Sequence, residues 1–214
     1  MLSKYDRVIV LEDDIVTSKF FLRFMNEALE CYKNTHEVVS ISGYIYRIET
    51  GLPSTFLLRG TDCWGWATWR RGWSCFNPDG GVLLAQLCQR KLEFEFNYEG
   101  SVDYIDMLRA QVKGENDSWA IRWYAAAFLA DKLTLYPGVS LVQNIGNDGS
   151  GSHAIATDWY EIALAGWNPD VGDIPVEENR AVRREVARHL WRRRRGGRLL
   201  ARFPALWPLV SSLS

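Results

Sequence analysis

The segment RVIVLEDD (residues 7–14) joins a short aliphatic run directly to three acidic residues, Glu12, Asp13 and Asp14. A continuous apolar run of this length is typical of a strand that is buried on both faces, as in a parallel sheet covered by helices. In open sheets of that kind, ligands bind beyond the carboxyl ends of the strands. We therefore expect an α/β fold with the acid triplet at its ligand-binding edge.

The patterns that follow alternate between helices and further strands. Apolar residues at helical spacing between Phe21 and Leu29 predict a helix, with Thr17 or Ser18 as its cap. Further strands are expected at 38–46, 54–60 and 133–138, the last of them continued by 140–146. Further helices are expected at 67–73, 83–87, 101–112, 118–130 and 176–195, the last of them ended by Gly196 and Gly197.

The net charge of −1 hides a division into an acidic body and a basic tail. Between Arg180 and Arg202 there are ten arginines and one glutamate, a net charge of +9, which leaves −10 on residues 1–179. Such a tail predicts phosphate-bearing partners, and it leaves two alternatives open: contact with an anionic membrane surface, or docking on the acidic body. Nucleic acid is not expected as a partner, because no base-reading motif accompanies the charge.

Cysteine usage and hydropathy predict the compartment. The four cysteines form no C-x-x-C pair, and with only three histidines a zinc site of the usual spacing is not expected. Scattered free thiols are typical of a reducing compartment, and we find neither a secretory signal pattern nor an apolar run long enough to span a bilayer. We expect a cytoplasmic protein, at most peripheral to the inner face of the membrane.

The acid triplet suits a divalent cation. Three adjacent carboxylates repel one another, and desolvation raises the cost of keeping them ionised. Mn²⁺ or Mg²⁺ relieves that repulsion, because both ions prefer carboxylate oxygens together with substrate phosphates. The alternative is that Glu12 to Asp14 begin an exposed loop and cap the helix that follows.

Ten tryptophans provide either core or ligand platforms. Trp66, Trp69 and Trp73 are spaced as on one face of a helix, which favours a core role. Trp64 falls outside that stripe and is the better candidate for stacking on a sugar ring.

Five motifs within residues 5–155 carry a family resemblance: VIVLEDDIVTSKFFLRFMNEAL, SISGY, CWGWATWRRGW, NDSWAIRWY and LYPGVSLVQNIGNDGSGSH. Together they resemble a bacterial family of GT-A-fold glycosyltransferases (family 2-like sugar transferases), which is itself similar to the N-acetylglucosaminyltransferase that initiates complex N-glycans. The resemblance implies a GT-A-like mixed sheet flanked by helices. It also implies transfer of a sugar from a nucleotide-sugar, such as a UDP-sugar, to a glycan or lipid-linked acceptor in polysaccharide biosynthesis.

The resemblance assigns roles to the residues of the two best motifs. The triplet stands where the family has its D-x-D metal motif, so Asp14 is expected to hold Mn²⁺ (or Mg²⁺) on the donor diphosphate. Asp13 is expected near the donor sugar or ribose, with Glu12 in support. Gly65 and Trp66 match a loop close to donor and acceptor.

Two further residues complete the expected site. An inverting transferase needs a carboxylate that takes the proton of the acceptor hydroxyl, and it needs positive charge on the leaving diphosphate. The family's base precedes the second tryptophan of a W-D-D-W segment; here the acid is displaced by one position, to Asp117, which we expect to be the base or else a helix cap. His153 closes a glycine-rich loop and is expected to finish the diphosphate or metal site.

The resemblance also bears on chain organisation. In the family, a segment with the first strand and the nucleotide-base pocket precedes the metal motif, so we expect an N-terminally truncated and therefore impaired transferase. Residues 1–160 then form the metal- and acceptor-binding part of a GT-A domain, and residues 161–214 form a linker, a basic helix and an apolar tail.

Two other functions compete with this one. A sugar nucleotidyltransferase shares the α/β layer and the acidic metal site, but it needs a glycine-rich phosphate loop, which we do not find. A non-catalytic carbohydrate-binding or interaction remnant would use the tryptophans as its platform.

Overall fold

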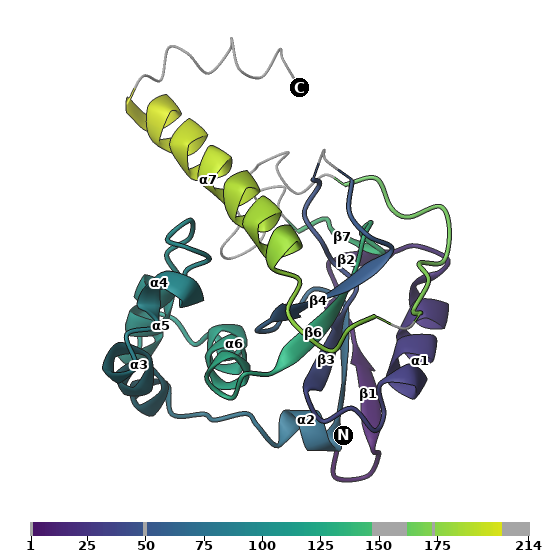
Figure 1. Ribbon diagram of the computed structural model, residues 1–214. Coiled ribbons are helices and arrows are strands. Elements are labelled where there is room, and N and C mark those ends of the chain that lie inside the picture. Colours follow the sequence, from purple (N-terminus) through teal and green to yellow (C-terminus); the bar gives the residue numbers. More distant parts are fainter. Residues whose placement is uncertain (1, 49–50, 147–161, 173, 203–214) are drawn as a thin grey trace.

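The computed structural model describes residues 2–48, 51–146, 162–172 and 174–202, and its side chains to Arg192 and at Arg194. This part of the chain has a mixed α/β fold, with helices on both faces of a mixed sheet (Figure 1). The strands are β1 (Arg7–Val10), β2 (Ile15–Thr17), β3 (Val38–Ser42), β4 (Thr55–Arg59), β5 (Trp66–Trp69), β6 (Leu133–Pro137) and β7 (Val142–Asn144). The helices are α1 (Phe21–Cys31), α2 (Arg70–Trp73), α3 (Gly80–Gln89), α4 (Glu93–Phe96), α5 (Tyr104–Val112), α6 (Trp119–Leu129) and α7 (Arg180–Arg202).

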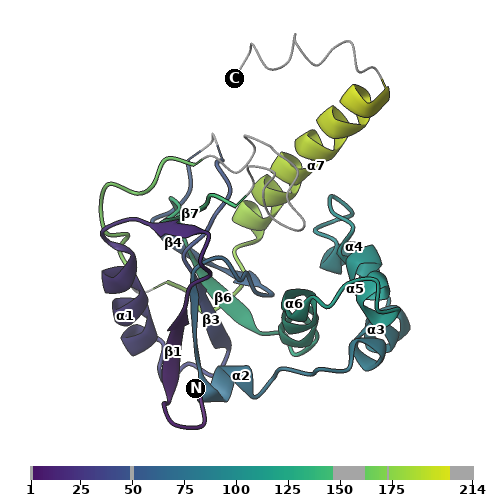
Figure 2. The same cartoon turned by 180° about the vertical axis from the view of Figure 1, so that it is seen from behind.

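The main sheet has five strands in the order β1-β5-β3-β6-β4. Only the β3–β6 pair is parallel, whereas the other three pairs are antiparallel. A small second sheet pairs β2 with β7 and lies at the end of the molecule opposite the N-terminus and α2 (Figures 1 and 2). The expected α/β class is confirmed, and so is the mixed sheet flanked by helices that the resemblance implies, whereas the purely parallel sheet expected from residues 7–11 is not found.

The expectation that residues 7–11 form a strand buried on both faces of a parallel sheet is wrong. β1 lies at an edge of the sheet and pairs antiparallel with β5, with Val10 opposite Trp66. Its side chains are only half-buried or exposed. A purely aliphatic run is compatible with both positions, because periodicity reports how apolar a strand is and not how many neighbours it has.

The tryptophan-rich segment is also corrected. Residues 66–69 form strand β5, and only Arg70–Trp73 are helical. Successive side chains of a strand point to opposite faces, so Ala67 and Trp69 pack with α1 on one face, while Trp66 packs with Trp123 of α6 on the other. The predicted core role of Trp66 and Trp69 is confirmed, but the helical face on which they were expected does not exist.

Two large cores lie on the two faces of the sheet. Helix α1 covers one face, and its apolar stripe is fully buried there. The hydroxyl of Ser18 accepts a hydrogen bond from the Phe20 N–H at 3.2 Å before this helix begins. On the other face, helices α3 to α6 pack with β4 and β6 (Figures 1 and 2).

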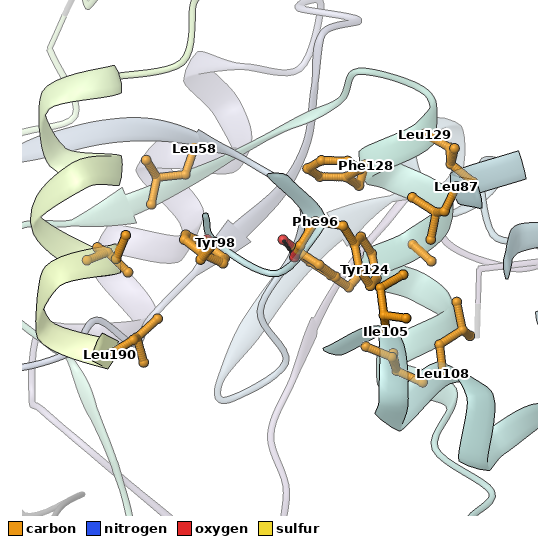
Figure 3. Packing of buried hydrophobic residues seen from close by; sticks show 14 of the residues in the cluster. Leu58, Leu87, Phe96, Tyr98, Ile105, Leu108, Tyr124, Phe128, Leu129 and Leu190 are labelled. Atoms are coloured by element: carbon orange, nitrogen blue, oxygen red, sulfur yellow. Dashed lines mark hydrogen bonds between the residues drawn. The ribbon is translucent and has the colours of Figure 1, made fainter. Parts of the chain in front are cut away.

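Helix α7 belongs to this second core over its first three turns. Figure 3 shows Leu190 of α7 and Leu58 of β4 on one side of Tyr98, with the side chains of α3, α5 and α6 on the other. Residues 162–171 contribute Ile162, Ala165 and Val171 to the first core. Residues 162–171 and the first three turns of α7 therefore both contribute side chains to the cores of the body.

The charges of α7 also dock on the body. Arg183 is only 7% exposed and pairs with Glu99 at 2.9 Å and Glu178 at 3.0 Å. Arg194 pairs with Asp103 at 2.8 Å. Of the two alternatives for the basic tail, the described part of α7 is consistent with docking. The helix continues through Gly196 and Gly197, so the prediction that they end it is wrong.

Candidate functional site

Strand register brings two distant motifs to one edge of the sheet. Val10 at the end of β1 and Ser42 at the end of β3 both lie opposite Trp66, the first residue of β5. The acid triplet therefore leaves the sheet beside the loop of residues 62–65 that enters it. The N–H of Gly43 donates to the carbonyl of Gly65 at 2.7 Å and fixes this loop to the end of β3.

Asp14 is held by the strand pair β2–β7. The Asn144 side-chain amide donates to Asp14 Oδ2 at 3.1 Å, and the N–H of Ile145 donates to the Asp14 carbonyl at 2.9 Å. Gly146 completes the contact, since a Cβ there would lie 2.5 Å from Asp14 Oδ2. The sequence motif around residues 140–146 thus folds back to position the carboxylate.

The second oxygen of this carboxylate is the notable feature. Asp14 Oδ1 is buried and has no hydrogen-bond partner among the described residues. A buried, unpaired carboxylate oxygen is costly, and a bound cation is one of the few groups that relieves that cost. No group of three or more His, Cys, Asp or Glu side chains that could hold a metal lies within the described ranges. These residues supply one carboxylate and a supporting amide, which fits an ion that takes its other ligands from water and phosphate.

The other two acids of the triplet are exposed. The pKa of Glu12 is raised by desolvation and, to a smaller extent, by the charges of Asp14 and Asp13. This mutual repulsion is the effect expected from three neighbouring carboxylates. Positive charge placed at this edge lowers the repulsion between the three carboxylates.

Gly65 and the two tryptophans beside it have different surroundings. Gly65 has φ +56°, and a Cβ at this position would meet Val142 Cγ1 at 2.6 Å. Trp66 is 3% exposed, with its ring among Trp73, Trp119 and Trp123. This burial gives Trp66 a core role and does not support the expected substrate contact. Trp64 is half-buried and makes an edge-to-face contact with Tyr44, with ring centroids 4.7 Å apart.

A cavity of about 350 Å³ opens beside Trp64. Its wall is mostly aromatic and comes from segments far apart in the chain, including Tyr44, Tyr46, Trp64, Tyr104 and Tyr124. Its polar wall is formed by Thr61 and Asp62. Concave, mainly apolar cavities with a few polar groups are typical of small-molecule sites. Trp64, the predicted sugar platform, therefore faces a cavity of suitable character.

Asp62 is the residue that sequence reasoning missed. Its carboxylate accepts a hydrogen bond from the Trp64 N–H at 3.0 Å. Burial raises the pKa of Asp62 to about 6, with a smaller contribution from the charge of Glu12, and hydrogen bonds from Trp64 and Cys63 oppose that rise. A lone aspartate before C-W-G-W carries no motif signal, because its burial depends on rings contributed by other segments.

Asp117 lies just outside this cavity. It is exposed, and the N-cap of α6 is Ser118, whose hydroxyl accepts from the Ile121 N–H at 3.3 Å. The alternative reading of Asp117 as the helix cap is therefore wrong. Ala120 and Ile121, one turn later, line the cavity. His153 lies outside the described residues.

Comparison with known proteins does not identify a relative. No protein-family model matches the chain, and no curated protein is similar enough to indicate a relationship.

The expectation that no segment spans a bilayer concerns helices that are both long and apolar. Among the described residues, no helix combines the length and apolar character needed to cross a bilayer.

Proposed function

We propose that the chain is a metal-dependent glycosyltransferase of the GT-A type that moves a sugar from a nucleotide-sugar, such as a UDP-sugar, to a glycan or lipid-linked acceptor with inversion. The proposal rests on Asp14, whose Oδ1 is buried without a partner while Asn144 holds Oδ2. Buried polar atoms are normally hydrogen-bonded. A buried carboxylate with one held oxygen and one unpaired oxygen gains from a cation bound at the unpaired oxygen.

The surroundings of Asp14 agree with transfer chemistry. Mn²⁺ or Mg²⁺, when bound, would neutralise the charge that develops on a departing diphosphate. The chain itself then has to orient the donor, exclude water and take one proton from the acceptor. The triplet and the 62–65 loop share one edge of the sheet, so the unpaired carboxylate oxygen of Asp14 and the aromatic cavity belong to the same edge. A metal-bound sugar diphosphate requires the first environment, and a sugar ring requires the second.

Binding of Mn²⁺ in the presence and absence of UDP tests the proposal directly. Free Mn²⁺ is followed by electron paramagnetic resonance for the unmodified chain and for Asp14→Asn, which keeps the size of the side chain. We expect Asp14→Asn to weaken binding by at least about tenfold, the scale on which metal sites respond even to loss of a supporting group. Asp106→Asn, an exposed carboxylate on α5, is the matched control and should bind normally. Equal Mn²⁺ affinity in all three proteins would refute the proposal.

A carbohydrate-binding module is the second candidate, and the aromatic cavity is the observation that favours it. Such a module would bind free sugars without Mn²⁺ or a nucleotide. A transferase would also bind Mn²⁺ and UDP at Asp14, so the titration above separates the two.

Contact with an anionic membrane surface is a further part of the proposal. Trp191 and Arg192 are exposed on α7, between Leu190, which lies in the core, and Arg194, which pairs with Asp103. Flotation with liposomes that contain anionic lipids, with and without residues 190–214, tests this contact. Equal flotation of both proteins would exclude a role for the tail.

A further inference from the structure

The cavity beside Trp64 has two polar groups on an otherwise mostly aromatic wall. Thr61 and Asp62 sit on its wall, and the hydroxyl of Thr61 is buried with no hydrogen-bond partner among the described residues. A buried hydroxyl is normally satisfied. The cavity thus presents a carboxylate and an unused hydroxyl side by side, surrounded by rings.

The aromatic wall is held in a fixed arrangement. Tyr44 packs edge-to-face against both Trp64 and Tyr46, with centroid distances of 4.7 and 5.3 Å. Tyr46 hydrogen-bonds with Tyr104 of α5, and Tyr104 packs on Tyr124 of α6 at 5.2 Å. A preorganised wall of this kind lowers the cost of ordering side chains when a ligand binds.

Size and chemistry together point to one ligand class. About 350 Å³ lies at the small end of the range of about 300–1,000 Å³ for small-molecule sites. A pyranose ring offers C–H faces for the aromatic wall and hydroxyl groups for Asp62 and Thr61. A phosphate would be repelled by the Asp62 carboxylate.

We propose that this cavity binds the acceptor pyranose and that Asp62, rather than Asp117, takes the proton of the attacking hydroxyl. This inference rests on the proposed function for its catalytic half. In the step, the acceptor oxygen forms a bond to the anomeric carbon of the donor sugar. The bond between that carbon and the diphosphate oxygen breaks, its electron pair leaves with the diphosphate, and the acceptor proton moves to the Asp62 carboxylate.

The comparison with Asp117 favours Asp62 on geometry. Asp117 is exposed at the start of α6 and does not line the cavity, whereas Asp62 lines it beside Trp64. A general base has to reach the proton that it removes, and a site that excludes water strengthens its contact. The pKa of Asp62, raised to about 6, is also closer to neutrality than that of an ordinary aspartate.

Burial has the largest effect on the pKa of Asp62, and the charge of Glu12, two residues beyond β1, adds a smaller rise. Burial raises the pKa of the Cys63 thiol and of the Tyr46, Tyr98 and Tyr136 hydroxyls, so these groups remain neutral near pH 7.

Two methionines provide a matched reporter and control for binding. Met107 lines the cavity, while Met25 of α1 is fully buried in the other core. The test is a titration, followed by NMR, of a chain labelled at the methionine methyl carbons. The ligands are the methyl glycosides of glucose, galactose, mannose and N-acetylglucosamine, each added to about 10 mM, which is above the usual KM range. At least one of them should shift the methyl signal of Met107 and leave that of Met25 unchanged.

Substitutions then test the named residues. Trp64→Ala should abolish the Met107 shift, and Asp62→Asn, which preserves shape, should weaken binding at least threefold. If Trp64→Ala does not fold, Tyr104→Phe takes its place as the test, because it removes only a hydroxyl from the cavity wall. Absence of any Met107 shift, or shifts that persist unchanged in Asp62→Asn, would overturn the binding half of the inference.

The catalytic half has its own readout. UDP release that depends on the glycoside identified above should fall at least about 100-fold in Asp62→Asn. In the unmodified chain it should rise as the pH increases through about 6. Binding of Mn²⁺ and UDP should be unchanged in this variant. A larger loss in Asp117→Asn than in Asp62→Asn, or glycoside binding in a chain that does not bind Mn²⁺, would overturn the catalytic role. The latter result would also refute the proposed function while leaving the sugar site intact.

Discussion

Replacing Asp62 by Asn should make the protein more stable at neutral pH and not at acidic pH. The physical reason is that the folded chain raises the pKa of Asp62 from 3.8 to about 6. The folded state therefore binds this proton more tightly than the unfolded state does. Stability from this group is fully present below about pH 4 and is lost as the pH rises to about 6. Asn removes the ionisation and with it the loss.

The size of the effect follows from the shift. A change of one pKa unit corresponds to 1.36 kcal/mol, so ionised Asp62 costs about 3 kcal/mol of folding free energy above pH 6. The hydrogen bonds from the N–H groups of Trp64 and Cys63 oppose the rise in pKa and are therefore already included in this shift. The expected gain is about 3 kcal/mol at pH 8, or a rise in Tm of about 9 °C for a chain of this length.

Thermal unfolding of the unmodified chain and of Asp62→Asn, measured from pH 4.5 to pH 8, checks this prediction. The gap between the two Tm curves should be close to its maximum above about pH 6 and should narrow as the pH falls toward 4.5. Asp106→Asn, whose carboxylate is 67% exposed, should follow the unmodified chain within about 0.5 kcal/mol. A gap that is constant over the whole range, or one that closes as the pH rises, would refute the reasoning.

Three other substitutions test the contacts that hold the site and its scaffold. Arg183→Met leaves two partly buried glutamates without their guanidinium and should cost about 3–5 kcal/mol in urea unfolding; a loss under 1 kcal/mol would contradict the docked position of α7. Gly65→Ala forces a side chain onto φ +56° and against Val142, so calorimetry should register a loss of about 2 kcal/mol, whereas a neutral result would place the loop elsewhere. Asn144→Ala should lower Mn²⁺ affinity about 10-fold or more and also lower the Tm, because Asp14 Oδ2 and the N–H of Gly146 both lose their partner; normal affinity would mean that Asp14 needs no such support.

The elements that sequence predicted well are those with a periodic signal. The strands at 54–60 and 133–138 and the helices at 101–112 and 118–130 are confirmed as β4, β6, α5 and α6, with small differences at their ends. Each has a clear run of apolar residues bounded by turn residues, so local pattern and tertiary position agree. The wrong prediction for residues 7–11 concerns the neighbours of a strand, whereas the one for residues 67–69 concerns the element itself.

Residues 66–73 illustrate why the remainder was not predictable. Tryptophans spaced by three and four residues satisfy a helical stripe, yet β5 places Trp66 and Trp69 on opposite faces, each facing a different core. Two buried faces remove the alternation that would otherwise mark a strand. The pattern therefore could not distinguish a strand between two cores from a helix with one apolar face.

The same distinction separates the site residues that sequence can find from those it cannot. Asp14 is recognisable because its strand, its charge cluster and its position at a sheet edge are all local properties of eight consecutive residues. The significance of Asp62 depends on a cavity wall contributed by Tyr46, Tyr104 and Tyr124, which lie 16 residues before it and 42 and 62 residues after it. Desolvation of an acid is a property of everything packed around it. An aspartate with no motif can therefore be the more reactive of two carboxylates, and only the packed structure reveals it.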